Sequence, residues 1–253
     1  MTAQPGAPST AYTVVSDLAD LTAAILAGGL GTRLRSVVTD RPKVLAEVGG
    51  RPFLAYLLDQ LIAVGIKSAV LCTGYLGHQV QTTFGDSYAG LRLVYSQEAS
   101  PQGTAGALRV ALPLVESDCV LVLNGDSFCQ TNLPALWVSH LVRGAEATIL
   151  LTQVPDTGRY GRVQVEADGR VWRFDEKGGE SGPGWINAGI YVLNRRLLGT
   201  IPRSGAVSLE RAMFPVWIGR GLYGFQSTGR FLDIGTPEAY AVAGQFFARE
   251  TLI

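Results

Sequence analysis

The residues best suited to bind an anion lie together near the start of the chain. A glycine-rich segment follows an apolar run and carries hydroxyl and cationic side chains, with a further lysine after Pro42. Glycines free the backbone N–H groups to surround a phosphate, and the cations add attraction for it. We therefore predict a phosphate-binding loop made by Leu26, Ala27, Gly28, Gly29, Gly31, Thr32, Arg33 and Lys43.

This loop differs from two common phosphate-binding signatures. A Walker A loop needs Gly-Lys-Ser/Thr after its spacer, and a dinucleotide-binding loop needs a third glycine where Leu34 stands. A glycine-rich turn between a strand and a helix can also be purely structural. The three nearby cations, Arg33, Arg35 and Lys43, favour a phosphate site of another kind.

A second candidate for chemistry is Asp126, in the sequence Asn124-Gly125-Asp126. It follows the apolar run Cys119 to Leu123, which has the length of a buried strand. A carboxylate at the end of such a strand supplies the hard oxygen ligand that Mg²⁺ prefers in phosphoryl chemistry. The alternative is that Asp126 only forms a turn or caps the next segment.

The composition is that of a globular protein. The 253 residues include 47% hydrophobic and 17% charged residues, with 21 basic and 21 acidic side chains. This balance gives no overall field for nucleic acid or an anionic membrane, so we expect neither partner. No membrane-spanning run or export signal is evident and the cysteines are odd in number, so we expect a cytoplasmic protein with a flexible tail at residues 1–20.

The order of apolar runs predicts an α/β fold. Strand-like runs alternate with amphipathic helical patterns, which is typical of a Rossmann-like, mostly parallel sheet with helices on both faces. The predicted strands are 21–27, 68–73, 91–96, 119–124 and 147–154, and the predicted helices are 53–64, 78–84, 104–112 and 133–142. Ligands bind beyond the carboxyl ends of such strands, where the Gly28 loop falls.

The second half of the chain has a different pattern. Residues 162–166 and 170–174 flank the hairpin signal Ala167-Asp168-Gly169, and 185–194 is another strand-like run. We therefore expect an inserted antiparallel lobe that covers one end of the sheet and binds a second substrate. We predict a single domain over 21–253, with a nucleotide-binding half at 21–154 and a substrate-binding half at 155–253.

These motifs together resemble the sugar-1-phosphate nucleotidyltransferase family over about residues 21–245. The family signature reads roughly Gly-Gly-x-Gly-Thr-Arg, a variable spacer, then Pro-Lys, as in Gly28 to Lys43. The resemblance implies the nucleotide-diphospho-sugar transferase fold. It also implies that a sugar 1-phosphate attacks the α-phosphorus of a nucleoside triphosphate and releases pyrophosphate.

The same resemblance assigns roles to individual residues. The Gly28 loop and Arg33 would hold the β- and γ-phosphates, and Lys43 would neutralise the α-phosphate. Asp126 and Asp233, the latter in Asp233-Ile234-Gly235-Thr236-Pro237, would hold Mg²⁺. The nucleobase would lie at Gln97, Gln102, Gly103 and Thr104, although Thr104 could instead be an ordinary helix cap. The sugar phosphate would be held by Gly161, Glu176, Lys177, Asn187 and Gly189.

The motifs are most similar to those of D-glycero-α-D-manno-heptose 1-phosphate guanylyltransferases and enzymes acting on cyclitol phosphates. GTP is therefore the expected donor, with a heptose, hexose or cyclitol 1-phosphate as acceptor, in a possible homo-oligomer. Val44-Leu45-Ala46 departs from the Pro-Met-Ala that is common in that subgroup. The alternatives are a thymidylyl- or uridylyltransferase acting on glucose 1-phosphate and a non-catalytic regulator that binds a nucleotide sugar.

Overall fold

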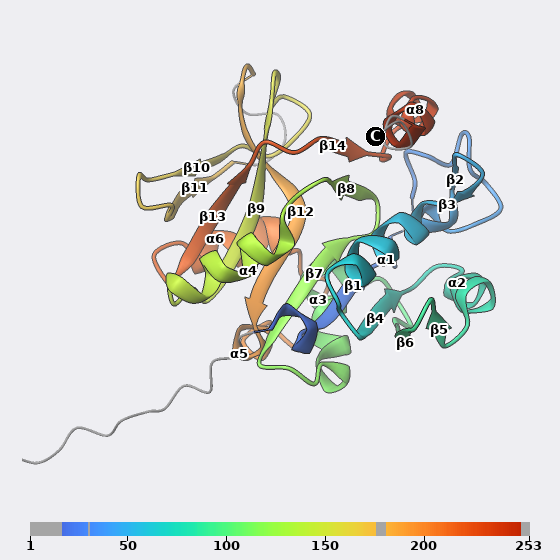
Figure 1. The fold of residues 1–253 in the computed structure, drawn as a ribbon, viewed down its shortest axis with the longest axis horizontal. Helices are drawn as coiled ribbons and strands as arrows, with labels where there is room; N and C mark the ends of the chain where they lie inside the picture. The colour runs from blue at the N-terminus through green and yellow to red at the C-terminus, as the bar shows by residue number, and fades with distance from the viewer. Residues whose placement is uncertain (1–16, 30, 176–180, 249–253) are drawn as a thin grey trace, which may run out of the picture.

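The computed structural model describes residues 17–29, 31–175 and 181–248, and its centre is an eight-stranded sheet (Figure 1). In spatial order the strands are β13 (Leu222–Ser227), β9 (Ala147–Val154), β12 (Gly184–Asn194), β7 (Cys119–Asn124), β1 (Thr22–Leu26), β4 (Ser68–Thr73), β6 (Leu91–Gln97) and β5 (Ser87–Tyr88). The neighbours β7, β1, β4 and β6 are parallel. The predicted mostly parallel α/β sheet is confirmed.

Helices cover both faces of the sheet. On one face lie α1 (Phe53–Ala63), α2 (Gly77–Phe84) and α4 (Leu133–Val142), and on the other lie α3 (Gly103–Ala111), α5 (Arg195–Leu198) and α6 (Phe214–Trp217). Successive residues of β1 point to opposite faces, so Ala23 and Ile25 join one core cluster and Ala24 joins the other. A strand buried on both faces must be apolar throughout, as β1 is.

The second half of the chain contributes to the central sheet as well as to the expected antiparallel strands. Its longest strand, β12, lies between β7 and β9 and is antiparallel to both, while β13 extends the same sheet parallel to β9. The physical reason lies in the sequence of β12, because the consecutive residues Ile190, Tyr191, Val192 and Leu193 are all buried. Such a run needs a layer on each face, and only the central sheet provides both.

Three small antiparallel pairs complete the strands. They are β2 (Glu47–Val48) with β3 (Arg51–Pro52), β8 (Ser127–Cys129) with β14 (Phe231–Asp233), and β10 (Val163–Val165) with β11 (Val171–Phe174). The predicted hairpin around Gly169 is β10–β11, and Gly169 has a φ of 86° in its turn. The antiparallel lobe is therefore limited to this hairpin and the β8–β14 pair.

Short helical segments connect these elements. They are η1 (Leu18–Asp20), η2 (Lys43–Leu45), η3 (Leu112–Leu114), the π-helix η4 (Leu209–Met213), α7 (Pro237–Ala241) and α8 (Ala243–Ala248). The predicted helix start at Pro237 is confirmed, with Thr236 as its N-cap. Leu18 is buried in the core, so the end of the expected N-terminal tail packs on the domain.

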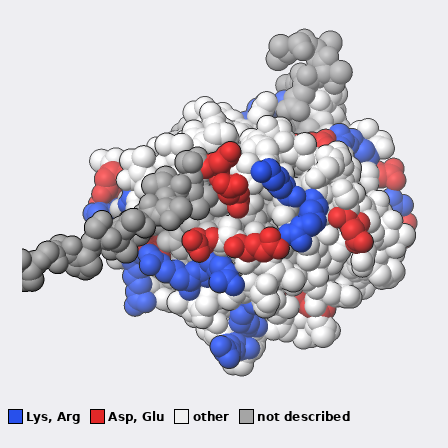
Figure 2. Space-filling model, turned by 60° about the horizontal axis from the view of Figure 1, so that its bottom comes forward, with Lys and Arg blue, Asp and Glu red and all other residues white. Residues whose placement is uncertain are grey.

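The surface carries both signs of charge. Figure 2 shows acidic and basic side chains interspersed on one face of the molecule, in keeping with the equal totals of the two kinds. Among the described residues, no helix combines the length and the apolar character needed to cross a membrane. Attraction for an anionic ligand must therefore come from local arrangements such as the predicted phosphate loop.

Candidate active site

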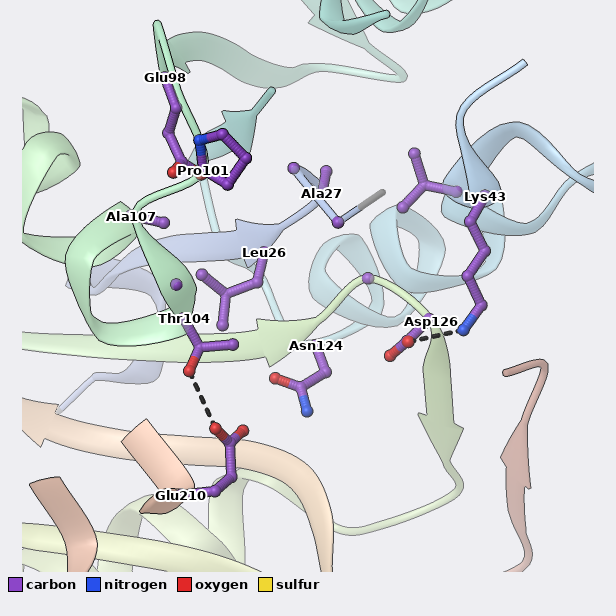
Figure 3. Close-up of a pocket in the computed structure, with 15 residues that line it drawn as sticks. Leu26, Ala27, Lys43, Glu98, Pro101, Thr104, Ala107, Asn124, Asp126 and Glu210 are labelled. Carbon is purple, nitrogen blue, oxygen red and sulfur yellow. Dashed lines mark hydrogen bonds and ion pairs between the residues drawn. The ribbon is translucent and has the colours of Figure 1, made fainter. Parts of the chain in front are cut away.

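A cavity of about 330 Å³ lies beyond the carboxyl ends of β1 and β7, beside the start of α3; we call it the nucleotide cavity. Figure 3 shows Glu98 and Pro101 at one end of it and Lys43 and Asp126 at the other. Its lining consists of Leu26, Ala27, Gly28, Gly29, Lys43, Val44, Glu98, Pro101, Gly103, Thr104, Ala107, Asn124, Gly125, Asp126 and Glu210. The strand ends thus bring the predicted loop and Asp126 together.

The loop after β1 has glycines, and therefore no side chains, at two of the positions where it lines the cavity. A Cβ on Gly28 would lie 2.8 Å from Glu98 Oε1, closer than real Cβ atoms approach, and 3.2 Å from the backbone nitrogen of Gly74, which is a tight contact. A Cβ on Gly29 would meet nothing within 4 Å, so this residue faces open space. Gly28 is therefore required by its close contacts, and Gly29 leaves its backbone accessible to a ligand.

Lys43 and Asp126 form an ion pair at the phosphate end of the cavity. Lys43 Nζ donates to Asp126 Oδ2 at 2.7 Å, and the lysine side chain is only 10% exposed whereas that of Asp126 is 40% exposed. Lys43 begins η2, and Asp126 follows β7 through Gly125, whose N–H donates to the carbonyl of Leu26. A cation and a carboxylate that meet in this way can hold a phosphate and its metal ion.

Glu98 lines the other end of the nucleotide cavity. Its Oε2 accepts a hydrogen bond of 2.5 Å from the backbone N–H of Gln102. Burial raises the pKa of this carboxyl, against the lowering effects of that hydrogen bond and of the Arg109 charge. A partly buried carboxylate here is an acceptor for the N–H groups of a ligand.

Glu210 joins the two halves of the chain at the cavity wall. Its Oε2 accepts from Thr104 Oγ1 at 2.9 Å (Figure 3) and from Ser208 Oγ at 2.7 Å. Thr104 Oγ1 in turn accepts from the N–H of Leu209 at 2.7 Å. The alternative of Thr104 as a helix cap is wrong, because the N-cap of α3 is Gln102 and the threonine hydroxyl bridges to η4 instead.

A second cavity, of about 270 Å³, adjoins the first; we call it the acceptor cavity. The two cavities share three lining residues, Asn124, Asp126 and Glu210. The remaining lining residues are Arg33, Ser127, Tyr160, Gly161, Phe174, Asn187, Gly189, Ser208, Arg211, Phe231 and Asp233. A ligand in each cavity would therefore meet the other at Asp126.

Asn187, a residue of β12 that lines the acceptor cavity, is held by hydrogen bonds to two other residues of the same strand. Its Oδ1 accepts from the N–H of Gly189 at 2.8 Å, and its Nδ2 donates to the hydroxyl of Tyr191 at 2.9 Å. Burial raises the pKa of the Tyr191 hydroxyl well above its usual value, so this tyrosine stays neutral. Nearby, Asn124 Oδ1 is buried and has no hydrogen-bond partner among the described residues.

The two predicted metal ligands converge although they are far apart in the sequence. Asp233 ends β14 and is paired with Ser127 of β8, directly after Asp126. The N–H of Ile234 also donates to the carbonyl of Asp126 at 3.0 Å. Both carboxylates line the acceptor cavity. The backbone pairing of β8 with β14 thus places them at one site.

The structure does not bring every predicted residue to its expected cavity. Arg33, predicted to hold the β- and γ-phosphates, lines the acceptor cavity. Of the described residues, Gly31, Thr32, Gln97 and Gln102 are not among those lining the nucleotide cavity. Glu176 and Lys177 lie outside the described residues, so their roles remain predictions.

Sequence reasoning missed several residues at the two cavities. Glu98 stood next to Gln97 in the predicted base-binding segment, and Asn124 and Tyr160 each stood beside a predicted residue, so a signal was present for all three. Glu210 carries no such signal, because the local sequence Ser208-Leu209-Glu210 is typical only of a helix start. Ser208 is indeed the N-cap of η4. Its second role at the cavity wall depends on contacts with α3 that no local pattern shows.

Comparison with known proteins agrees with this geometry. The model of the Nucleotidyl transferase family matches residues 22–250. The chain is 37% identical over 222 residues to the D-glycero-alpha-D-manno-heptose 1-phosphate guanylyltransferase of Aneurinibacillus thermoaerophilus, covering 87% of this chain and 96% of the relative. It is 35% identical over 222 residues to the mannose-1-phosphate guanylyltransferase of Mycobacterium tuberculosis, covering 86% of this chain but 62% of that protein.

Solved structures give the same result. HddC from Yersinia pseudotuberculosis, complexed with GMP-PN, matches with a TM-score of 0.79 and 31% identity over 90% of this chain and 99% of that chain. A putative glucose-1-phosphate thymidylyltransferase from Bacillus anthracis has a TM-score of 0.81 at 23% identity, covering 89% of this chain and 94% of that one, and shares the fold. From its fold, its paired cavities and these matches, the chain belongs to the nucleotidyl transferase family of sugar-1-phosphate nucleotidyltransferases.

Proposed function

We propose that this chain transfers GMP from GTP to a sugar 1-phosphate, forming a GDP-sugar and pyrophosphate. The observation that carries the proposal is the wall shared by the two cavities, because Asn124, Asp126 and Glu210 line both. A nucleotide in one cavity and a sugar phosphate in the other would meet beside Asp126. The names of the two guanylyltransferase relatives support this choice of reaction.

Glu98 supports guanine as the base. The N1–H and N2–H groups of guanine are neighbouring donors, and an ionised carboxylate can accept from both of them. Adenine, uracil and thymine do not present two adjacent donors to such a group. Glu98 lines the end of the nucleotide cavity away from Lys43 and Asp126 (Figure 3), so a base there leaves the phosphates near the ion pair.

The chain's own residues would act by positioning and by neutralising charge. A phosphate oxygen of the acceptor forms a bond to the α-phosphorus of GTP, the bond from that phosphorus to the bridging oxygen breaks, and pyrophosphate leaves with the electron pair. Lys43 would offset the negative charge on the α-phosphate, and the bare backbone at Gly29 would bind further phosphate oxygens. Since the attacking phosphate is already ionised at neutral pH, no general base is required.

The residues present fit a magnesium ion. Asp126 and Asp233 line one cavity and are held together by strand pairing, and carboxylates with phosphate oxygens are the ligand set that Mg²⁺ takes. When bound, the ion would supply positive charge to the phosphates of the two substrates. We assign Asp126 and Asp233 as its protein ligands.

The acceptor is proposed to be a sugar 1-phosphate with the configuration of a heptose or mannose, with cyclitol phosphates as further candidates. Asn187 and Asn124 line the cavity and are polar groups for its hydroxyls, and Arg33 and Arg211 line the same cavity and carry positive charge for its phosphate. Lys177 is predicted to bind that phosphate too. The proposal extends to this chain what the names of its relatives state for them.

A competition experiment tests the donor and the acceptor. Equal concentrations of GTP, ATP, UTP and dTTP would be incubated with the protein, Mg²⁺ and each of a panel of sugar 1-phosphates, and the products separated by mass. We expect GDP-linked sugars to dominate, because each buried hydrogen bond left unmade by another base costs roughly 1–3 kcal/mol. A dominant UDP- or dTDP-linked product would reject the guanylyl assignment. Tight nucleotide-sugar binding without turnover would favour the regulator.

A further inference from the structure

A chain of polar contacts lies behind the base end of the nucleotide cavity. It begins at Arg109 in α3, which is not among the residues lining the cavity. Arg109 Nη2 donates to Gln102 Oε1 at 3.0 Å, and Arg109 Nη1 is buried without a hydrogen-bond partner among the described residues. Arg109 as a whole is only partly buried, but leaving its buried Nη1 without a partner is costly, so the position is expected to have a purpose beyond packing.

Gln102 connects Arg109 to Glu98, because it contacts both residues. Its Nε2 donates to Ser100 O at 3.1 Å and to Ser100 Oγ at 3.0 Å, and its backbone N–H donates to Glu98 Oε2 at 2.5 Å. The side chain of Gln102 is therefore engaged on both sides and is not free to read a base. The same residue closes the loop from Glu98 to Gln102 over the start of α3.

The packing of α3 matches this arrangement. A Cβ on Gly106 would lie 2.7 Å from Gln102 Cβ, which is closer than side chains pack. The absence of a side chain at Gly106 lets Gln102 lie directly on the helix, where Arg109, one turn further along, can reach its carboxamide. Two independent features of α3, a glycine and an arginine, thus act on the same glutamine.

Charge links Arg109 to Glu98 as well. Burial raises the pKa of Glu98, and the positive charge of Arg109 opposes that rise. The other titratable neighbour is Cys72 in β4, whose pKa is raised to about 12 by burial and by the Glu98 charge, so this thiol stays neutral. Gly28, which lies close to Glu98 Oε1, brings no charge. Arg109 is therefore the cation that favours the ionised form of Glu98.

We propose that Arg109 is a positioning residue for donor selection, which acts through Gln102 to keep the Glu98 carboxylate placed and ionised for guanine. The inference rests on the proposed guanylyl transfer and deepens it. Arg109 itself touches no substrate. Its removal should therefore weaken the use of GTP while leaving the sugar phosphate and the chemical step almost unchanged.

Two variants and a pH profile test this role. Arg109→Met removes the charge and the donors at similar length, and we expect KM for GTP to rise about tenfold while kcat and KM for the sugar phosphate stay within about twofold. Without the cation the pKa of Glu98 rises, so the acid limb of kcat/KM for GTP should move to higher pH. Arg109→Lys restores the charge and one donor, and should bring both quantities most of the way back.

Arg92→Met is the matched control, since Arg92 pairs with Glu116 in an exposed contact at the other end of β6. It should change neither KM nor the pH profile. The proposal is overturned if Arg109→Met leaves both unchanged, or if Met and Lys variants lose kcat and thermal stability equally. If the wild-type protein uses GTP no better than the other triphosphates, the proposed function itself fails. The wild-type donor preference is therefore measured before any variant is made.

Discussion

The two cavities are built in different ways although they share a wall. The nucleotide cavity is lined by the ends of the adjacent strands β1 and β7, by the loops after β1 and β6 and by the start of α3. The acceptor cavity is lined by β8, β12 and β14, the segment before the β10–β11 hairpin and η4. The first depends on neighbouring parallel strands, whereas the second depends on pairings between distant segments.

The shared wall divides the lining residues into those expected to bind one substrate and those expected to act in the transfer. Residues that line only one cavity, such as Glu98 or Asn187, are expected to affect one substrate each. Residues of the shared wall are expected to affect the transfer itself, because the two proposed substrates would meet there. Variants on either side of this division can support it or contradict it.

The largest effect is expected at the shared wall, for Asp126→Asn. The variant keeps the shape of the side chain but loses the negative charge that faces Lys43 and the proposed Mg²⁺. Turnover should fall by on the order of a thousandfold with the fold retained, since charge neutralisation carries most of such a transfer. The measurement is steady-state pyrophosphate release at saturating Mg²⁺, with circular dichroism as the check on folding.

Asp168→Asn provides the control for that experiment. Asp168 pairs with Arg170 in the exposed turn of the β10–β11 hairpin, away from both cavities. It should keep wild-type turnover. Near-normal Mg²⁺-dependent activity in Asp126→Asn would remove Asp126 from the chemistry and with it the importance of the shared wall.

A smaller effect is expected for Lys43→Met, at the phosphate end of the nucleotide cavity. Because the charge on the α-phosphate grows in the transition state, kcat should fall about a hundredfold while KM for the acceptor changes little. Lys67→Met, at an exposed lysine, is the control and should leave kcat and both KM values unchanged. A rise in KM for GTP with kcat intact would show that Lys43 only binds the donor.

Residues that line only one of the two cavities are expected to give the next, smaller effects on activity. Asn187→Ala should raise KM for the sugar phosphate about tenfold and leave KM for GTP alone, since Asn187 lines only the acceptor cavity. Glu98→Gln should do the opposite, because Glu98 lines only the nucleotide cavity. Both constants would be measured for both variants. Equal changes in the two constants would mean that the cavities do not bind separate substrates.

The same division explains how much of the molecule the sequence could predict. The strands of the central sheet, at whose edge the nucleotide cavity lies, are apolar runs, and the predicted ranges 68–73, 119–124 and 147–154 coincide with β4, β7 and β9. The strands β8 and β14 have three residues each, which is too short for any periodicity to appear. They become strands only because the folded chain places them side by side.

At the site, residues next to a recognisable motif were predictable and residues placed by distant contacts were not. The loop at Gly28 and the turn before Asp126 were found from local patterns and line the nucleotide cavity. Glu210 was missed because its position depends on Thr104, 106 residues away in the sequence. The side chain of Gln102 is predicted to bind the base, whereas in the structure it contacts Ser100 and Arg109.

The smallest effect on activity is expected far from both cavities, at the opposite end of the sheet. His140 in α4 is 2% exposed, hydrogen-bonds through Nδ1 with Thr148 Oγ1 at 2.9 Å and stacks on Trp137. Burial lowers its pKa from 6.5 to about 4, against the opposing effects of Asn194 and Glu146. The folded protein thus holds a neutral histidine that the unfolded chain would protonate.

The sign of the pH dependence follows from this difference. Above pH 6.5 both the folded and the unfolded state carry a neutral His140, and between pH 6.5 and about 4 only the unfolded state gains the proton. The free energy of unfolding therefore decreases as the pH is lowered through this range, by roughly 3 kcal/mol at most. His140→Asn, which keeps a partner for Thr148, should flatten that acid-side fall in the free energy of unfolding measured by urea denaturation. The exposed His78→Asn should not. Both variants should keep wild-type KM values for GTP and the sugar phosphate, since neither residue lines a cavity described here. If His140→Asn altered either KM, the two cavities would not be independent of the far end of the sheet, and the division between binding and supporting residues would have to be redrawn.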